Sequence, residues 1–454
     1  MTFVSIRCLS GFAFAAATAS AFAQSAAQAP PSNAQPSPQQ MQTIVVTGSA
    51  VPRTDLETPS PVTVLNSQDI KRSGLTTVSD VVRSISANNS GTIPTAFTGG
   101  FAAGASGVAL RGLTVNSTLV LVDGMRQANY PLADDGQRSF VDLNTIPLSA
   151  VDRIEVLKDG ASSIYGADAI AGVVNVILKH DYQGNEVTAE VGNSQHGGGL
   201  EKRATGVFGH GDLGTDHYNA YLAFEYQRDN RIRVSQRGFP FNTPDLSSIG
   251  GSNLIGGQPA LHSGSIFGSV APGMLPPGSD PVAGVQRTGP WQPLRPCGAG
   301  TTEVNDPNDD LGGGDGSYCT QDFQSRYNDI QPEEERFGLL GRFTAQINEN
   351  TEAYLEASYY QNEVKSDGSP PQIQSGTPHN TNAIALPPTL ADGSLNPNNP
   401  FAAQGQYALI NYAFGDIKGG SDLKNHVARM VAGMRGTAGE WNWNADLNIN
   451  HAWL

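Results

Sequence analysis

The chain has 454 residues, of which 52 are glycine and only 15% are charged, and its formal net charge is −15 at pH 7. This length leaves room for two or more domains. The acidic balance and the lack of a basic stripe exclude a nucleic-acid-binding protein, because phosphates repel such a surface. Abundant glycine with 38% hydrophobic residues is unlike a soluble α/β enzyme. It predicts a β-rich fold whose surface does not face water everywhere.

Residues 1–23 have the three parts of a secretory signal peptide. Residues 1–7 carry one positive charge, residues 8–19 are apolar, and Ala21-Phe22-Ala23 forms a small-x-small cleavage site. We expect export and cleavage before Gln24, with a buried N-terminal helix as the alternative. No later apolar run reaches the roughly 20 residues that a membrane-spanning helix needs. If the chain crosses a membrane, it therefore does so with strands.

The mature chain keeps two cysteines, Cys297 and Cys319. Export into an oxidising compartment predicts that they form a disulfide, with two free thiols as the alternative. No histidine lies at ligand spacing near either cysteine, so we predict no metal site there.

A linker and a short isolated β segment follow the signal peptide. Residues 24–42 are rich in Ala, Gln, Pro and Ser, which predicts a flexible linker. Residues 43–49, with the sequence TIVVTGS, are strong β-formers stranded between this linker and Pro52. Such a segment is an unpaired strand suited to a partner's sheet edge. The alternative is an ordinary first strand of the next domain.

Residues 54–180 have the pattern of a small mixed α/β domain. Strands are predicted at 61–65, 108–112 and 118–124, and short helices at 77–83 and from Ser67, which we assign as an N-cap. Residues 91–107 and 125–138 are glycine-rich or polar loops. The domain ends at 150–179, where two β-branched strands, 153–158 and 172–179, flank a small, turn-rich segment.

From residue 185 onward apolar and polar residues alternate with a period of two. Phe337, Leu339 and Phe343, for example, alternate with Arg336 and Arg342. Strands beyond ten residues with one apolar face are typical of a transmembrane barrel. Short turns on one side and long loops at 231–333 and 367–423 on the other favour this fold over a soluble β-sandwich. Seven strands are predicted, near 185–194, 200–210, 216–230, 334–347, 351–366, 424–437 and 440–454.

Three segments together resemble the TonB-dependent outer-membrane receptors. Residues 43–47 resemble the TonB box, Leu110-Arg111-Gly112 with residues 119–124 resemble the central strands of the plug, and residues 150–179 are similar to the last plug segment. The resemblance implies a mixed fold, with a small α/β plug domain (54–180) followed by antiparallel transmembrane β-barrel strands (185–454). Seven strands of the family's 22 would make the barrel incomplete.

The resemblance also implies partners and site residues. The chain would lie in the outer membrane of a Gram-negative cell, in contact with lipid, the periplasmic protein TonB and a nutrient ligand. The TonB-binding residues would be Thr43, Ile44, Val45, Val46 and Thr47. The plug motif residues would be Arg111, Gly112, Asp123, Gly124, Arg153, Glu155, Lys158, Gly160, Tyr165 and Gly166.

Four of the plug motif residues, Arg111, Arg153, Glu155 and Lys158, are charges within otherwise apolar predicted strands. Inside a barrel such charges must be paired or hydrated. We expect them to pair with inward-facing polar barrel residues as a releasable lock, with a simple surface salt bridge as the alternative for each. Candidate ligand contacts in the apical plug loops are Arg126, Tyr130 and Arg138.

No enzyme motif is found, and no cofactor is implied. The HExxH pattern is missing, and Gly160-Ala161-Ser162-Ser163-Ile164 lacks the second glycine of a nucleophile elbow. The acidic loop from Asp306 to Asp315 departs from the EF-hand pattern at its glycine and final glutamate, which favours a solvated loop over a calcium site. The predicted function is TonB-dependent, proton-motive-force-energised import of a scarce bulky nutrient, with the plug gating the barrel. A passive surface-binding or adhesion barrel and a non-functional fragment remain as alternatives.

Overall fold

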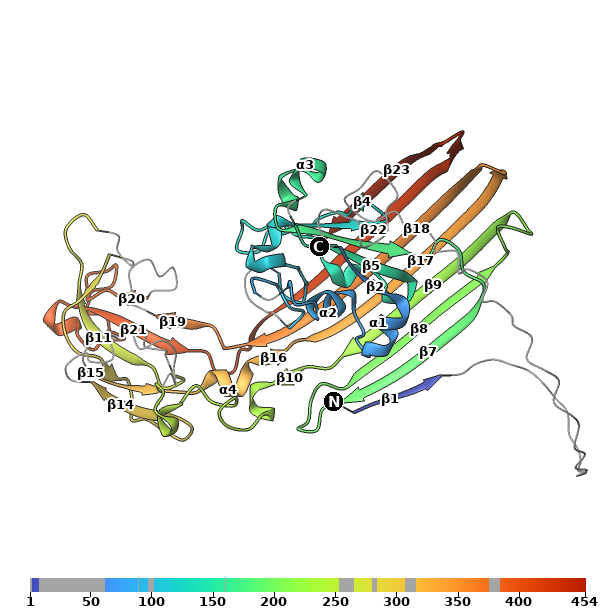
Figure 1. Cartoon of the computed structure of the whole chain (residues 1–454). Coiled ribbons are helices and arrows are strands. Elements are labelled where there is room, and N and C mark those ends of the chain that lie inside the picture. The colour runs from blue at the N-terminus through green and yellow to red at the C-terminus, as the bar shows by residue number, and fades with distance from the viewer. Residues whose placement is uncertain are drawn as a thin grey trace, which may run out of the picture.

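A computed structural model describes residues 2–7, 62–88, 90–96, 102–159, 161–252, 265–279, 284–306, 316–374 and 384–454. It has three parts (Figure 1). We call the long antiparallel sheet the wall, the domain on one of its faces the plug, and the described residues of 234–331 and 369–418 the head. The predicted linker, the TonB box and most of the predicted signal peptide lie outside the described residues.

The wall confirms the seven predicted strands. Its order is β1-β7-β8-β9-β17-β18-β22-β23, and every neighbouring pair is antiparallel. β22 begins at Gly419, earlier than predicted. The edge strand β1 (Thr2–Arg7) belongs to the segment expected to be a signal peptide, whose cleavage stays a prediction. The other strands are β7 (Gly184–Asn193), β8 (Glu201–His210), β9 (Tyr218–Asp229), β17 (Glu333–Asn348), β18 (Thr351–Gly368), β22 (Gly419–Ala438) and β23 (Trp441–Trp453).

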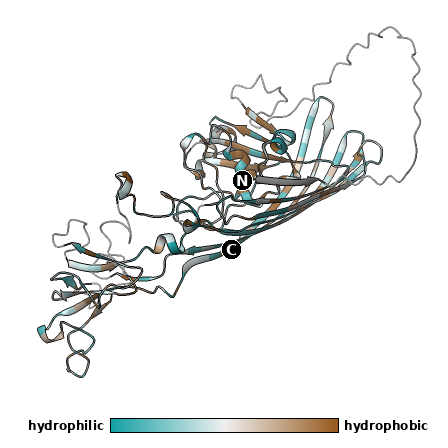
Figure 2. Ribbon diagram, turned by 90° about the horizontal axis from the view of Figure 1, so that it is seen from below, coloured by the Kyte–Doolittle hydropathy of each residue, from teal (hydrophilic) through white to brown (hydrophobic). Residues whose placement is uncertain are grey.

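The two faces of the wall differ in polarity, because successive side chains of a strand point to opposite faces. Along β17, Arg336 and Arg342 are buried towards the plug, whereas Phe337, Leu339 and Phe343 are exposed on the other face. Figure 2 shows the wall nearly edge-on, with the plug on one side only. An apolar outer face with a polar inner face is the arrangement of outer-membrane barrel strands. No helix among the described residues is long and apolar enough to cross a membrane.

The plug contains a five-stranded sheet of order β2-β5-β6-β3-β4, in which only the β3–β6 pair is parallel. Its β-branched strands β5 and β6 are buried in the core, as the continuous apolar runs predicted. The strands are β2 (Val62–Asn66), β3 (Thr118–Val122), β4 (Met125–Arg126), β5 (Val151–Leu157) and β6 (Gly172–Leu178). The helices are α1 (Ser67–Ser73), α2 (Val78–Arg83) and α3 (Ser162–Tyr165), with short 3₁₀ turns η1 (Leu110–Gly112), η2 (Val115–Ser117), η3 (Leu143–Thr145), η4 (Leu148–Ala150) and η5 (Ala167–Ala169).

Two local predictions for the plug were wrong. The predicted strand at 108–112 is instead a loop ending in η1, because Arg111 and Gly112 both have positive φ, 57° and 72°. Two successive residues in that region turn the chain and cannot continue a strand. The N-cap of α1 is Asn66, whose Oδ1 accepts from the Asp69 N–H at 2.9 Å, and not Ser67.

The two long segments predicted as loops are not structureless. Strands β11 (Ser269–Met274) and β21 (Tyr407–Ala413), one from each segment, pair antiparallel and join both segments into a six-stranded sheet. The head has its own apolar cluster around Trp291 and Leu409. The predicted disulfide Cys297–Cys319 is confirmed there, and it closes a sequence separation of 22 residues.

The remaining elements outside the plug and wall are short. The strands are β10 (Ile232–Arg233), β11 (Ser269–Met274), β12 (Gln286–Arg287), β13 (Gln292–Pro293), β14 (Thr302–Asp306), β15 (Gly316–Thr320), β16 (Asp329–Gln331), β19 (Gln372–Gln374), β20 (Ala385–Leu386) and β21 (Tyr407–Ala413). The helical turns are α4 (Phe323–Tyr327), η6 (Val234–Gln236), η7 (Ser247–Ile249) and η8 (Ala402–Gln404). Most of the acidic loop from Asp306 to Asp315 lies outside the described residues.

Candidate functional site: the plug–wall interface

The plug rests on an apolar pad in the middle of the wall's inner face. Val207, Ala223 and Leu340 are register partners on β8, β9 and β17, so they form one row across three strands. All three are buried in the same cluster as the plug core. Burial of a side chain as large as Val207 or Leu340 stabilises by about 1.5–3 kcal/mol. The pad therefore positions the plug on the wall. Polar contacts lie on both sides of the pad along the strands.

Towards the short turns, the wall presents a buried charge cluster to the plug. Arg342 Nη1 lies 2.9 Å from Glu356 Oε2 and 3.4 Å from Asp123 Oδ2 of the plug. Arg429 forms an ion pair with Glu356 and donates from Nη2 to the Val122 carbonyl at 3.3 Å. The side chains of Arg342, Glu356 and Arg429 are at most 2% exposed. Two cations and two carboxylates thus join β3 of the plug to β17, β18 and β22.

Asp123 is the plug residue that enters this charge cluster. Its Oδ1 accepts from the Leu178 N–H at 2.8 Å, and its backbone has a positive φ of 52° in the turn after β3. Burial, with a smaller contribution from Glu356, raises the pKa of Asp123 from 3.8 to about 6, although Arg342 opposes the shift. The ion pair with Arg342 therefore does not outweigh the cost of burying the Asp123 carboxylate. This contact positions the plug without holding it tightly.

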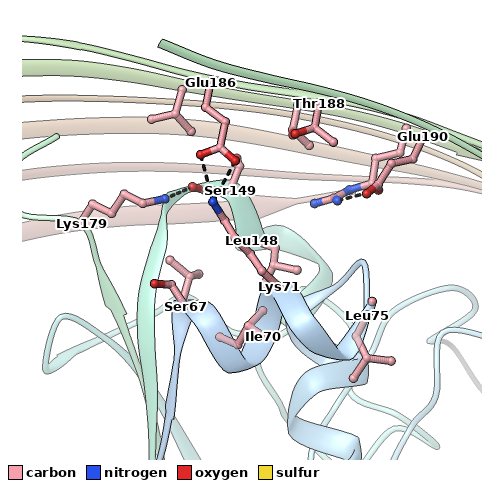
Figure 3. Close-up of a pocket in the computed structure, with 15 residues that line it drawn as sticks. Ser67, Ile70, Lys71, Leu75, Leu148, Ser149, Lys179, Glu186, Thr188 and Glu190 are labelled. Atoms are coloured by element: carbon pink, nitrogen blue, oxygen red, sulfur yellow. Dashed lines mark hydrogen bonds and ion pairs between the residues drawn. The ribbon is translucent and has the colours of Figure 1, made fainter. Parts of the chain in front are cut away.

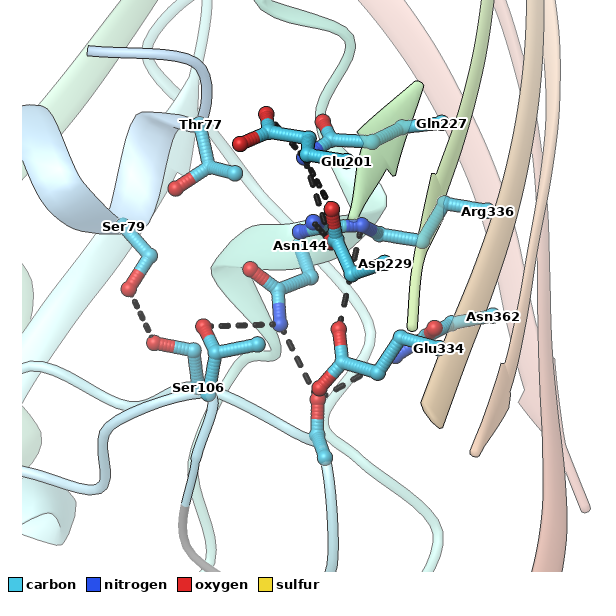
Figure 4. A network of polar contacts seen from close by, with 12 residues as sticks. Thr77, Ser79, Ser106, Asn144, Glu201, Gln227, Asp229, Glu334, Arg336 and Asn362 are labelled. Atoms are coloured by element: carbon cyan, nitrogen blue, oxygen red, sulfur yellow. Dashed lines mark hydrogen bonds and ion pairs between the residues drawn. The ribbon is translucent and has the colours of Figure 1, made fainter. Parts of the chain in front are cut away.

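Towards the head, a second polar region joins the plug loop 102–107 and η3 to the wall (Figure 4). Asn362 of β18 donates to the Gly104 carbonyl at 3.1 Å. Gly104 has a φ of +72°, and a Cβ there would lie 2.1 Å from Val364 Cγ2, so only glycine permits this approach. Asp142 accepts from Asn425 at 3.1 Å, and burial raises the pKa of Asp142 to about 6.

A cavity of about 110 Å³ separates α1 of the plug from β7 and β8 (Figure 3). Lys71 of α1 crosses the gap to Glu186 of β7 at 2.8 Å, and both side chains are about half exposed. Lys179, in the connection from plug to wall, donates to the Ser149 carbonyl. Burial lowers the pKa of Lys179 to about 8. Among the described residues, the Lys71–Glu186 pair is the ion pair that joins the first plug helix to the wall, beside this cavity.

The structure pairs three of the four expected lock residues inside the plug, and it does not bring them to the wall. Arg153 binds Glu155 and Asp152, at 2.9 and 3.0 Å. Arg111 donates to the carbonyls of Ile170 and Ala171, at 2.7 and 3.2 Å.

The expectation that these charges pair with wall residues is therefore wrong for Arg111, Arg153 and Glu155. Their partners are neighbouring groups within the plug. Lys158 follows the end of β5 and makes no salt bridge in the described part of the chain. Gly160 is outside the described residues. Of the remaining motif residues, Gly112, Gly124 and Gly166 occupy turns with positive φ, and the Tyr165 carbonyl accepts from Arg126 at 2.6 Å.

The three predicted ligand contacts have separate partners. Arg126 forms an ion pair with Asp168, which lowers the pKa of that carboxyl, and its own carbonyl accepts from Asn448 of β23 at 2.8 Å. Tyr130 is buried and stacks on Phe140 with 5.5 Å between ring centroids, so its ring is not available to a ligand. Arg138 pairs with two aspartates of its own loop and stays partly exposed.

Sequence reasoning missed the wall side of the interface. The pad residues and the buried charges Glu334, Glu356 and Arg429 were not singled out. One signal was available: these charges occupy the polar face of strands whose other face is apolar. That pattern identifies inward positions, but it does not say which of them meets the plug, because the partner lies more than a hundred residues away.

Comparison with known proteins assigns the plug. Residues 54–173 match the family model of the TonB-dependent receptor plug domain. Among solved structures, the chain is similar to a mutant ferric enterobactin receptor of Pseudomonas aeruginosa bound to enterobactin, with 16% identity and a TM-score of 0.43 over 87% of this chain and 41% of that one. It is also similar to the siderophore receptor PirA of Acinetobacter baumannii (17%, TM-score 0.34, 86% and 47%). A third is the ferripyoverdine receptor of Pseudomonas aeruginosa (14%, TM-score 0.39, 87% and 38%).

The chain spans less than half the length of each of these three solved receptors. The assignment of the plug rests on this match, which covers β2 to β5, the plug helices and η1 and ends at the start of β6. Residues 54–173 are therefore a TonB-dependent receptor plug domain, and the antiparallel strands of the wall from β7 onward follow it along the chain.

Proposed function

We propose that this chain acts in TonB-dependent import of a scarce, bulky nutrient across the outer membrane, and that it is not an enzyme. The observation that carries the proposal is the seat of the plug: a receptor plug domain lies on the polar inner face of strands whose outer face is apolar. The apolar outer face would contact outer-membrane lipid. The head, formed by the two long connections, would lie on the extracellular side and contribute to ligand capture together with Arg126 and Arg138.

The proposed energy input reaches the plug through its edge strand. TonB, driven by the proton-motive force, would pair with residues 43–47 and pull on the chain that leads into β2, an edge strand of the plug sheet. The next element, α1, is held to the wall by Lys71 and Glu186, a solvated pair of the kind worth about 0–1 kcal/mol. The Asp123 contact adds little holding force, since burial disfavours its charged form. These weak polar contacts suit a plug that is displaced and reseated.

Deletion of Thr43–Thr47 tests the coupling. The full gene product would be expressed in a Gram-negative strain that lacks its own receptors for the probes, and uptake of ⁵⁵Fe-labelled ferric enterobactin and ferripyoverdine would be measured. We expect the deletion to abolish energised uptake and to leave surface binding intact, whereas deletion of five linker residues at 32–36 should preserve both. Equal uptake by all three proteins would contradict TonB coupling and favour a passive surface-binding barrel.

A cross-link tests whether the plug must move. Cysteines at Lys71 and Glu186 would be bridged by a short non-reducible thiol cross-linker, which is practical because Cys297 and Cys319 are already paired. The control bridges Glu363 and Lys424, which form a 3.3 Å ion pair within the wall. Uptake should be lost with the first bridge and retained with the second. Undiminished uptake through a bridged plug would refute plug gating, and a protein that binds neither probe nor TonB would fit a non-functional fragment.

A further inference from the structure

The polar region between the plug and β17 contains a carboxylate that has no donor. Both Oε atoms of Glu334 are buried and lack a hydrogen-bond partner, and the residue is 2% exposed. The nearest cation is Arg336, whose Nε lies 3.8 Å from Glu334 Oε2. Arg336 is already committed to Asp229, with 2.6 Å between Nη2 and Oδ2 (Figure 4). A buried carboxylate in this condition is costly, because no hydrogen bond replaces water and its one ion pair is long and shared with Asp229.

The charges around Glu334 do not balance. Arg336 forms ion pairs with Asp229 and Glu334, and its charge also acts on Asp142, so three carboxyls share one guanidinium. Two negative charges are in excess when all three are ionised. The Asp142 carboxylate is held by neutral donors, the N–H groups of Ser106 and Asn144 and the amide of Asn425. The neighbouring Glu201, and Arg203 with its partners Glu190 and Glu225, do not remove the excess. Some positively charged species must therefore neutralise this region.

Three amide oxygens, from both sides of the interface, are likewise buried and without a hydrogen-bond donor. The Oδ1 atoms of Asn144, Asn362 and Asn425 are buried without a donor. Asn362 is the register partner of both Arg336 and Asn425, and Asn144 shares the Gly104 carbonyl with Asn362, so these side chains occupy one patch.

The orientation of these three amides is fixed by their other ends. The Nδ2 groups of Asn144 and Asn362 donate to Gly104 at 3.0 and 3.1 Å, and that of Asn425 donates to Asp142 at 3.1 Å. Flipping any of them would replace a donor by an oxygen that faces an oxygen. The acceptor atoms therefore point away from these bonds, where no protein donor reaches them.

We propose that Glu334 and the amide oxygens of Asn144, Asn362 and Asn425 form a site for a hard, oxygen-preferring cation that joins the plug to the wall. A proton on Glu334 would add one donor and leave most of these oxygens unsatisfied. A Ca²⁺ ion accepts 6–8 oxygen ligands, including carboxylates and amide carbonyls, and neutralises the two excess charges at once. The described residues contain no cluster of three or more His, Cys, Asp or Glu side chains placed for a metal, so this site relies on neutral ligands.

The test uses the full chain folded in detergent micelles, with Ca²⁺ as the probe, and equilibrium dialysis against ⁴⁵Ca²⁺. Glu334→Gln keeps the shape of the side chain and removes its charge. Glu335→Gln is the matched control, because Glu335 is the next residue of β17 and points to the exposed face. We expect Glu334→Gln to bind one Ca²⁺ fewer per chain, or at least tenfold more weakly, than the wild type, and Glu335→Gln to bind like the wild type. The test compares the Ca²⁺ bound by each variant with that bound by the wild type. Ca²⁺ bound elsewhere in the chain, including at the acidic loop, is therefore subtracted.

A second variant and a second readout keep the result interpretable. Asn362→Ala keeps Glu334 and removes one oxygen ligand, so its Ca²⁺ affinity should fall several-fold. Ca²⁺ should also raise the Tm of the wild type and of Glu335→Gln, but not that of Glu334→Gln. Equal Ca²⁺ binding by Glu334→Gln and Glu335→Gln overturns the proposal. So does a Glu334→Gln protein that is more stable than the wild type at saturating Ca²⁺, since that identifies a proton as the neutralising species.

Discussion

Asparagine at position 123 isolates the charge of the plug residue that meets the wall's buried ion cluster. Asn keeps the Oδ1 acceptor for the Leu178 N–H and tolerates the positive φ of 52° at this turn. It removes only the carboxylate whose pKa burial raises from 3.8 to about 6. Arg342 keeps its partner Glu356 at 2.9 Å, so the wall cluster stays paired. The substitution therefore reports the net free energy of burying the Asp123 charge.

The direction of the pH effect follows from the raised pKa. Between about pH 4 and pH 6 the folded protein holds the Asp123 proton and the unfolded chain has lost it. The free energy of unfolding of the wild type therefore falls as the pH rises through this window. A shift of about 2 pKa units corresponds to about 3 kcal/mol. We expect Asp123→Asn to gain about 3 kcal/mol relative to the wild type between pH 4 and pH 8, and to be at least as stable as the wild type at pH 8.

The assay is urea unfolding of the full chain in detergent micelles, followed by circular dichroism across this pH range. The matched control is Asp135→Asn, because Asp135 also has a positive φ, 51°, but its side chain is 65% exposed. The pH dependence of Asp123→Asn is read against that of this variant. If Asp123→Asn lost about the same stability at pH 8 as at pH 4, or more, the Asp123–Arg342 pair would be a net stabilising bond. The view of it as a weak, releasable contact would then be wrong.

Three further tests concern a close glycine contact, the disulfide and the apolar pad. Gly172→Ala should lower the free energy of unfolding in urea by more than about 3 kcal/mol, because a Cβ at φ +136° would lie 2.3 Å from the Leu157 carbonyl oxygen. The control Gly124→Ala also has a positive φ but an open surrounding, so it should cost about 1 kcal/mol. Replacing Cys297 and Cys319 by serine should destabilise the head by about 3 kcal/mol. Proteolysis of the head should then be faster, while the wall stays protected. Equal cleavage of head and wall would contradict a head that unfolds separately from the wall. Leu340→Ala should cost about 2–5 kcal/mol and loosen the plug, and a loss below 1 kcal/mol would argue against the apolar pad.

Local patterns were sufficient for the elements with strong periodicity. The alternation on β17 and β18 predicted strands, their faces and their short turn, because a period of two depends only on neighbouring residues. The β-branched runs of β5 and β6 predicted buried strands for the same reason. Where conformation depended on a distant partner, prediction failed. The segment around Arg111 turns at two residues of positive φ, and in this turn the Arg111 side chain reaches the carbonyls of Ile170 and Ala171, some sixty residues away.

The sequence by itself determined the plug motifs, the strands of the wall and the two cysteines that pair. Only the tertiary structure decided which residues hold the plug. Arg153 had the charge expected of a lock residue but found Glu155 within its own strand, whereas Asp123 and Asp142 reach Arg342 and Asn425 across more than two hundred residues. The physical reason is that the cost of burying a charge depends on everything that surrounds it in space, and those neighbours are brought together by the strand register.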